Sequence, residues 1–131
     1  LALDQADSSK PIDIFVRTEG GWEADAFAEI DTIQSIRATE NVHGIGEVHS
    51  AGAMILAAGT GKRIVYENTL LGFHEAGADE EKAFEERYIN FWKKHGNLPE
   101  EWLNSRDEEM RYFTAEEAIK MGVADELRRN E

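Results

Sequence analysis

The sequence predicts an α/β domain with a largely parallel sheet and a helical C-terminal part. Ile12, Ile14 and Val16 fall on alternate positions, with Phe15 between them, which predicts a strand that ends at the glycine turn over 18–21. Residues 50–58 are small and apolar throughout, as is typical of a helix buried on all sides. Beyond Gly77 the short apolar runs between glycine turns give way to charged, amphipathic helix.

The remaining elements follow from periodicity and from turn residues. Thr114 and Glu117 form a capping-box pattern, which predicts the start of a last helix that ends at Gly122. Apolar residues at helical spacing, including Phe84 and Tyr88, predict a long helix whose stripe forms core or a subunit contact. The other expected elements are a helix over 27–36, a strand over 42–48, strands over 64–66 and 70–73, the long helix over 79–94, and a short helix at 102–103.

Length and composition limit the classes of function. The 131 residues fit one domain, 1–131, and the formal net charge of −13 argues against binding to nucleic acid or to an anionic membrane. The chain has no cysteine, which excludes disulfides and thiol chemistry, and no apolar run long enough to span a membrane. We expect a cytoplasmic protein with no cofactor and no metal.

Two local motifs have the composition of a catalytic site. Gly20 and Gly21 stand between a strand and a helix, where paired glycines expose amide groups that suit an oxyanion; the alternative is a plain turn. Ser50 stands where a strand passes into a small-residue helix, as in the G-x-S-x-G elbow of hydrolases, although Val48 replaces the first glycine. The alternative for Ser50 is a helix N-cap.

The four histidines differ in how well their positions suit a catalytic role. His74 follows an apolar strand, where α/β folds tend to place site groups, although a partly buried structural histidine is the alternative. His43 and His49 would share one face of their strand, but no third ligand is suitably spaced, so both are expected to be structural. His95 closes a helix, where a cation suits the helix dipole.

Four stretches, residues 10–21, 46–63, 71–75 and 113–125, carry these motifs in a definite order. Together they resemble the Clp protease proteolytic subunit (ClpP) family. They are similar to its strand and glycine turn, its nucleophile helix with the following G-K-R, its histidine-bearing strand and its closing signature. In the glycine turn, Thr18 and Glu19 replace the Ser-Pro pair of the family.

The resemblance implies a fold and a site. The fold would be a ClpP/crotonase-like spiral of β-β-α units. Ser50 would be the nucleophile, His74 the general base, and the backbone N–H groups of Gly21 and Ala51 the oxyanion hole. The implied activity is that of an ATP-dependent Clp-type serine endopeptidase that cleaves extended peptides or unfolded protein inside a homo-oligomeric ring.

The third catalytic residue of the family, an aspartate, aligns with Met110. A methionine cannot stabilise an imidazolium by charge. Asp107, Glu108 or Glu109 are the candidates to replace it, and the alternatives are a Ser–His dyad or an enzyme with little or no activity.

Two further departures concern assembly. The helical handle, roughly 79–95, lies in a segment that is shorter than the corresponding segment of the family by roughly a dozen residues. In the family this handle helps two rings to stack, so a double ring does not follow from the resemblance. The N-terminal segment with which the family engages an unfoldase ATPase is not found in these residues, so an ATPase partner does not follow from the resemblance. A phage assembly protein is the other possible partner, since shortened relatives of this kind are similar to phage head-maturation peptidases.

Two other functions compete with the peptidase, and one variant of the peptidase uses a different base. The first is a catalytically inactive ring of the same fold, and the second is a crotonase-type acyl-CoA enzyme, against which the Ser50 and His74 pair argues. The variant is a peptidase with a Ser–Lys dyad through Lys62, but His74 is the stronger candidate for the base.

Overall fold

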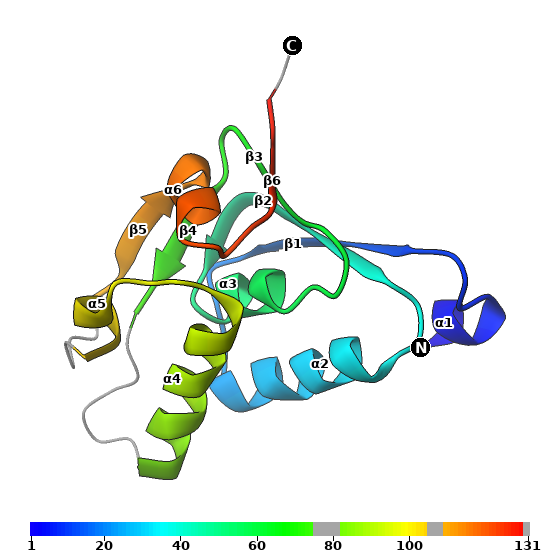
Figure 1. Cartoon of the computed structure of the whole chain (residues 1–131), viewed down its shortest axis with the longest axis horizontal. Helices are drawn as coiled ribbons and strands as arrows, with labels where there is room; N and C mark the ends of the chain where they lie inside the picture. Colours follow the sequence, from blue (N-terminus) through cyan, green and yellow to red (C-terminus); the bar gives the residue numbers. More distant parts are fainter. Residues whose placement is uncertain (75–81, 105–108, 130–131) are drawn as a thin grey trace.

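The computed structural model describes residues 1–74, 82–104 and 109–129, and it shows helices packed on a curled, mixed sheet (Figure 1). After a short N-terminal helix that the sequence analysis did not predict, strands and helices alternate along the first half of the chain as predicted. They are α1 (Ala2–Ala6), β1 (Ile12–Thr18), α2 (Glu23–Ser35), β2 (Glu40–His49), α3 (Ala51–Ala57), β3 (Arg63–Tyr66), β4 (Leu70–Phe73), α4 (Lys82–His95), α5 (Glu100–Asn104), β5 (Arg111–Thr114), α6 (Ala115–Lys120) and β6 (Glu126–Arg128).

Strand β2 is the centre of the sheet. Its residues 42–44 pair with β1 on one edge and with β3 on the other, whereas its residues 47–49 pair with β4. The backbone changes direction between these two stretches, where Gly46 adopts a φ of 62°. Strand β2 therefore connects two parts of one sheet. The strand order of this sheet is β5-β4-β2-β3-β6, and β1 pairs with β2 as well.

The prediction of a largely parallel sheet is confirmed, since only the β4–β5 pairing among those described is antiparallel. The C-terminal part is helical as predicted, but it also contributes β5 and β6, which the sequence analysis missed. Their residues, Arg-Tyr-Phe-Thr and Glu-Leu-Arg, lack the apolar runs by which the similarly short β3 and β4 were predicted. The predicted long helix is α4, although residues 79–81 lie outside the described part of the chain.

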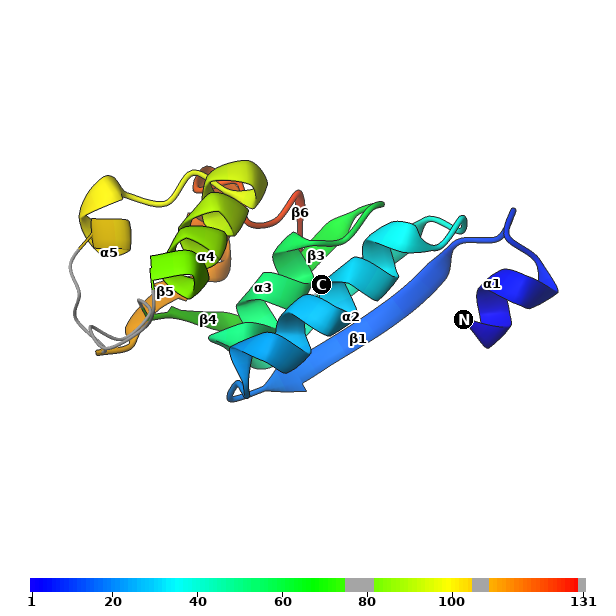
Figure 2. The ribbon, with the colours of Figure 1, turned by 90° about the horizontal axis from the view of Figure 1, so that it is seen from below.

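The predicted buried helix is α3, and it occupies the middle of the molecule. It packs against β1, β2, β3 and β4, and α2 packs on its outer side. Figure 2 shows α2, α3 and α4 on the same side of the sheet. The stripe of α4 is buried at Tyr88, Phe91 and Trp92, as predicted for core, whereas Phe84 is 46% exposed and does not belong to the core of this chain.

Arg63 and Asp125 join two of the recognised motifs. The Arg63 guanidinium donates to both carboxylate oxygens of Asp125, at 2.7 and 2.9 Å, and to the carbonyl oxygens of Ala57 and His95. These hydrogen bonds lower the pKa of Asp125. The start of β3, the ends of α3 and α4, and the turn before β6 are thereby held together. The capping box of Thr114 and Glu117 is also present, at the start of α6.

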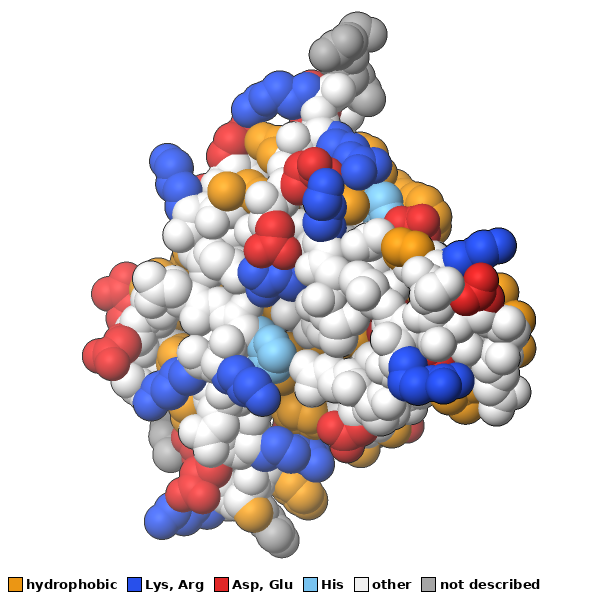
Figure 3. Space-filling model, turned by 45° about the vertical axis from the view of Figure 1, so that its right-hand side comes forward, with side chains coloured by type: hydrophobic (Ala, Val, Ile, Leu, Met, Phe, Trp, Pro, Cys, Tyr) orange, Lys and Arg blue, Asp and Glu red, His pale blue; other side chains and the backbone are white. Residues whose placement is uncertain are grey.

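The surface carries charges of both signs. On the face shown in Figure 3, Lys and Arg side chains are interspersed with Asp and Glu rather than gathered in one patch. Among the described helices, none has the length and apolar character that a membrane span requires.

His95 closes α4 as predicted, but its surroundings disfavour the cation that the helix dipole would suit. Burial lowers the pKa of His95, and the neighbouring cations Lys94 and Arg63 lower it further. The ring lies 4.6 Å from that of Phe91, and its Nε2 is 3.3 Å from the Gln34 side-chain nitrogen. The neutral imidazole is therefore the form that this environment favours.

Leu70 and Leu71 are neighbours on opposite faces of β4, with exposures of 36% and 0%. Leu71→Ala leaves a cavity in the core, so we expect it to lower the free energy of unfolding by about 3 kcal/mol. Leu70→Ala is the matched control and should cost no more than about 1 kcal/mol. Urea denaturation measures both, and equal losses would contradict the described burial of β4.

His95→Gln tests the charge state of His95. Because the folded-state pKa of His95 lies below its unfolded-state value of about 6.5, the stability due to the neutral ring is fully present above that unfolded-state value and is lost as the pH falls through the folded-state pKa. We therefore expect the free energy of unfolding of the unmodified protein to decrease more steeply between about pH 7 and pH 5 than that of the variant. Parallel pH curves from urea denaturation would show that His95 titrates normally.

Candidate active site

Ser50 has an unusual backbone conformation. It lies between β2 and α3 with φ 53° and ψ −116°, and it is the only non-glycine residue with positive φ in the described chain. Such a conformation costs on the order of 1–3 kcal/mol and is found chiefly at functional sites. Ser50 occupies the N-cap position of α3, but its side chain makes no capping hydrogen bond. The structure therefore does not support the simple N-cap alternative.

The Ser50 hydroxyl meets the ring of His74. Its Oγ lies 2.6 Å from His74 Nε2, which is within hydrogen-bond distance. The two residues follow adjacent parallel strands, in which His49 of β2 is paired with Gly72 of β4. The Ser50 N–H continues this ladder by donating to the Gly72 carbonyl oxygen at 2.7 Å. Strand pairing thus brings together two residues that are 24 positions apart.

The glycine turn lies against Ser50. Gly20 has a φ of 120°, a conformation that side chains rarely tolerate, and a Cβ placed there would be 3.0 Å from Ser50 Cβ. The N–H of Gly20 donates to Thr18 Oγ1 at 3.1 Å, which closes the turn after β1. The turn is therefore more than a connection between β1 and α2, because its shape permits close approach to Ser50.

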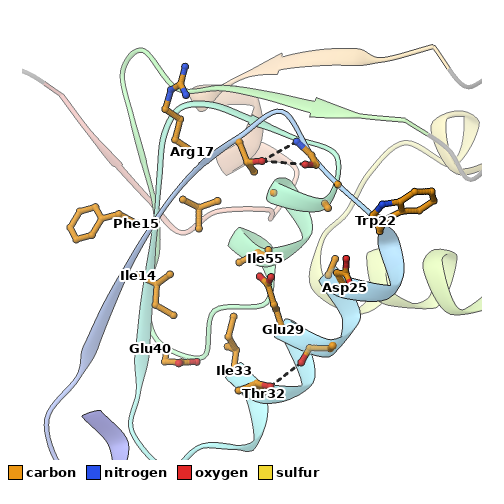
Figure 4. A pocket seen from close by; sticks show the side chains of 18 residues that line it. Ile14, Phe15, Arg17, Trp22, Asp25, Glu29, Thr32, Ile33, Glu40 and Ile55 are labelled. Carbon is orange, nitrogen blue, oxygen red and sulfur yellow. Dashed lines mark hydrogen bonds between the residues drawn. The ribbon is translucent and has the colours of Figure 1, made fainter. Parts of the chain in front are cut away.

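Two backbone donors border the same pocket. Within the described chain, the N–H groups of Gly21 and Ala51 donate no hydrogen bond. Both residues line a pocket of about 820 Å³ between β1 and α2. Figure 4 shows Ile14, Ile33 and Ile55 around this pocket, whereas the Trp22 side chain, 82% exposed, points away from it.

The residues near the expected acid position are only partly described. Met110 packs on β4, since a Cβ built on Gly72 would lie 2.7 Å from Met110 Sδ. Glu109 is exposed, and Asp107 and Glu108 lie outside the described residues. A thioether therefore contacts the strand beside Ser50 at the position where the resemblance puts an aspartate.

The remaining candidates lie in other contacts. His43 Nε2 is 2.9 Å from Asp13 Oδ1 and its Nδ1 is 2.9 Å from Tyr66 Oη, and the first bond lowers the pKa of Asp13. His49 packs edge-on against Tyr112 of β5. No group of three potential ligands suited to a metal occurs in residues 1–74, 82–104 and 109–129.

In the described part of the chain, the Lys62 ammonium makes no hydrogen bond with Ser50. Its Nζ is 3.8 Å from Glu126 of β6, on an exposed side chain. The Ser–Lys alternative therefore has no geometric support.

One contact of the site escaped the sequence analysis. The hydroxyl of Tyr88 in α4 donates a hydrogen bond to the backbone carbonyl oxygen of His74. Tyr88 belongs to the aromatic stripe of its helix, so its sequence position indicates packing and gives no sign of this polar contact. Only the arrangement of α4 beside β4 reveals it.

Comparison with known proteins identifies one family. The profile of the family described as Clp protease matches residues 1–131. The chain is 30% identical to an ATP-dependent Clp protease proteolytic subunit of Deinococcus radiodurans, over 97% of this chain and 69% of that protein. It is 28% identical to proteolytic subunit 2 of Thermobifida fusca, over 99% of this chain and 71% of that protein. For proteolytic subunit 2 of Streptomyces coelicolor the identity is 27%, over 97% and 65%. The chain thus spans about two thirds of the length of these relatives.

The two turn glycines offer a matched pair of substitutions. Gly20→Ala would place a Cβ 3.0 Å from Ser50 Cβ at positive φ, whereas a Cβ on Gly21 meets nothing within 4 Å. We expect Gly20→Ala to lower the free energy of unfolding by about 1–3 kcal/mol, and Gly21→Ala to lower it by clearly less. Equal stabilities in urea denaturation would mean that the turn relaxes away from Ser50.

Proposed function

The chain belongs to the Clp protease family, and on this basis we propose that it is a serine endopeptidase that cleaves extended peptides or unfolded protein through an acyl-enzyme. The observation that carries the proposal is the 2.6 Å separation between Ser50 Oγ and His74 Nε2. A serine hydroxyl is a weak nucleophile unless a base takes its proton as it attacks, and a neutral imidazole within hydrogen-bond distance can do so.

The reaction follows from this pair. Ser50 Oγ attacks the carbonyl carbon of the scissile peptide bond while its proton moves to His74 Nε2. As the tetrahedral intermediate collapses, the C–N bond breaks and the leaving amine takes the proton from His74. Water, deprotonated by His74, then attacks the acyl-enzyme ester, and the proton returns to Ser50 as the acid product leaves.

The negative oxygen of each tetrahedral intermediate needs donors that are already in place. In this proposal they are the N–H groups of Gly21 and Ala51, which donate no other hydrogen bond in the described chain and border one pocket. Donors that need no reorganisation stabilise developing charge strongly, and loss of one typically costs 10²–10³ in rate. The tight turn at Gly20 would bring the Gly21 amide close to Ser50.

Membership of this family also supports a proposal for the substrate and for the assembly of the protein. An extended peptide can add as a strand near the glycine turn after β1, where main-chain hydrogen bonds give affinity without strong sequence preference. A ring of copies enclosing the sites would restrict access to unfolded chains, and an unfoldase ATPase or a phage assembly protein would supply them. Several relatives are named as subunits of an ATP-dependent protease, which supports this reading.

A catalytically inactive ring is the second candidate, and Met110 is the observation that favours it. Loss of the orienting acid alone lowers the rate by orders of magnitude but leaves some catalysis. A crotonase-type acyl-CoA enzyme is less well supported, because the serine and histidine pair fits acyl transfer to a hydroxyl.

Labelling with a fluorophosphonate probe tests the proposal. We expect intact mass to show one adduct on the unmodified protein, because an activated serine attacks phosphorus as it would a carbonyl. Ser50→Ala should show no adduct, and His74→Ala should react at least about a hundredfold more slowly. Ser35→Ala is the matched control, since Ser35 lies at the exposed end of α2, and it should label normally. A folded, unmodified protein that forms no adduct would favour the inactive ring.

A further inference from the structure

We propose that Tyr88 is a positioning residue for the catalytic base, acting through the backbone of His74. The inference rests on the proposed function and adds a residue from outside the strand and turn motifs. Its basis is the hydrogen bond from the Tyr88 hydroxyl to the His74 carbonyl oxygen.

Packing restrains the Tyr88 ring independently of the hydrogen bond that its hydroxyl makes. Its residue is 5% exposed, and the ring stacks on that of Phe73, with centroids 6.1 Å apart and planes 24° apart. Phe73 is itself enclosed by Trp92 of α4 and Trp102 of α5, whose rings lie 5.8 and 5.9 Å away. The hydroxyl therefore reaches the His74 carbonyl with little further loss of side-chain entropy.

The main chain of His74 is thus held from two directions. On the strand side, Gly72 pairs with His49 and accepts the Ser50 N–H, and Phe73 pairs with Arg111. From the helix side, Tyr88 holds the carbonyl of His74, which follows the last residue of β4. Fixing this carbonyl fixes the direction in which the His74 side chain leaves the backbone, and hence the approach of Nε2 to Ser50 Oγ.

The expected size of the effect follows from the geometry of proton transfer. A displacement of about 1 Å of a reacting group can cost about a hundredfold in rate, so the loss of one of two anchors should cost roughly tenfold. The effect should fall on kcat and leave KM unchanged, because Tyr88 acts on the base and is not proposed to touch substrate.

Tyr88→Phe removes the hydroxyl and keeps the stacked ring. Tyr112→Phe is the matched control: its side chain is 58% exposed, its hydroxyl makes no hydrogen bond within the described residues, and its ring contact with His49 is retained. We expect diisopropyl fluorophosphate to label Ser50 about tenfold more slowly in Tyr88→Phe than in the unmodified protein. Tyr112→Phe should label at the unmodified rate.

A second readout does not depend on activity. Histidine side-chain ¹H–¹⁵N spectra, assigned with the help of His74→Ala, report the bond between His74 Nε2 and Ser50 Oγ. Tyr88→Phe should move the His74 signals in the same direction as Ser50→Ala does, since both variants depopulate that bond, while the signals of the other three histidines stay in place. Tyr112→Phe should not move the His74 signals.

The outcomes separate the two proposals. If Tyr88→Phe labels at the unmodified rate and its His74 signals do not move, the positioning role is overturned while the peptidase stands. If the unmodified protein fails to label but the His74 signals move as expected, the positioning role stands and the proposed activity fails. A general loss of signal dispersion in Tyr88→Phe would show a role in folding and would overturn the inference.

Discussion

The hydrogen bond from the Ser50 N–H to the Gly72 carbonyl oxygen, at 2.7 Å, is the constraint on which the site depends. It is the last rung of the parallel ladder between β2 and β4, and it extends that ladder one residue past the end of β2. Two parallel strands end at the same edge of a sheet, so the residues that follow them are brought together. The contact between Ser50 and His74 is therefore a consequence of strand register, and an error of one residue in register would separate the two side chains.

Strand β2 can pair with β4 only because it bends after pairing with β3. Both partners lie on the same edge of β2, and the change occurs around Gly44 and Gly46. At Gly44 a Cβ would lie 3.2 Å from Leu56 of α3, and Gly46 has a positive φ. The first glycine lets the central helix approach the strand, and the second lets the strand turn. The bonds of Arg63 with Asp125 then hold the β3 side of the sheet in place.

The sequence predicts features with local causes and misses those with distant causes. The strand before Gly20, the buried helix after Ser50 and the capping box at Thr114 depend on neighbouring residues, and all are observed. Ser50, His74 and the glycine turn could be singled out because reactive side chains stand at strand ends, but their contact depends on strand order, which only the family resemblance implied. Strands β5 and β6 lack the apolar runs that identified β3 and β4. The lowered pKa of His95 could not be anticipated, because it arises chiefly from burial and then from the cations Lys94 and Arg63, of which Arg63 comes from another element.

Orientation of a catalytic imidazole has two separable components. A carboxylate facing the second ring nitrogen sets the tautomer and the rotation of the ring, whereas a hydrogen bond to the backbone sets the point from which the side chain starts. In this chain Met110 contributes packing against Gly72 at the position where the resemblance puts the acid, and packing also fixes the end of β4. Tyr88 acts on the same strand end through the carbonyl of His74. Both contacts restrain the main chain, so under the proposed mechanism α4 and Met110 would both help to position His74, whichever group faces its ring.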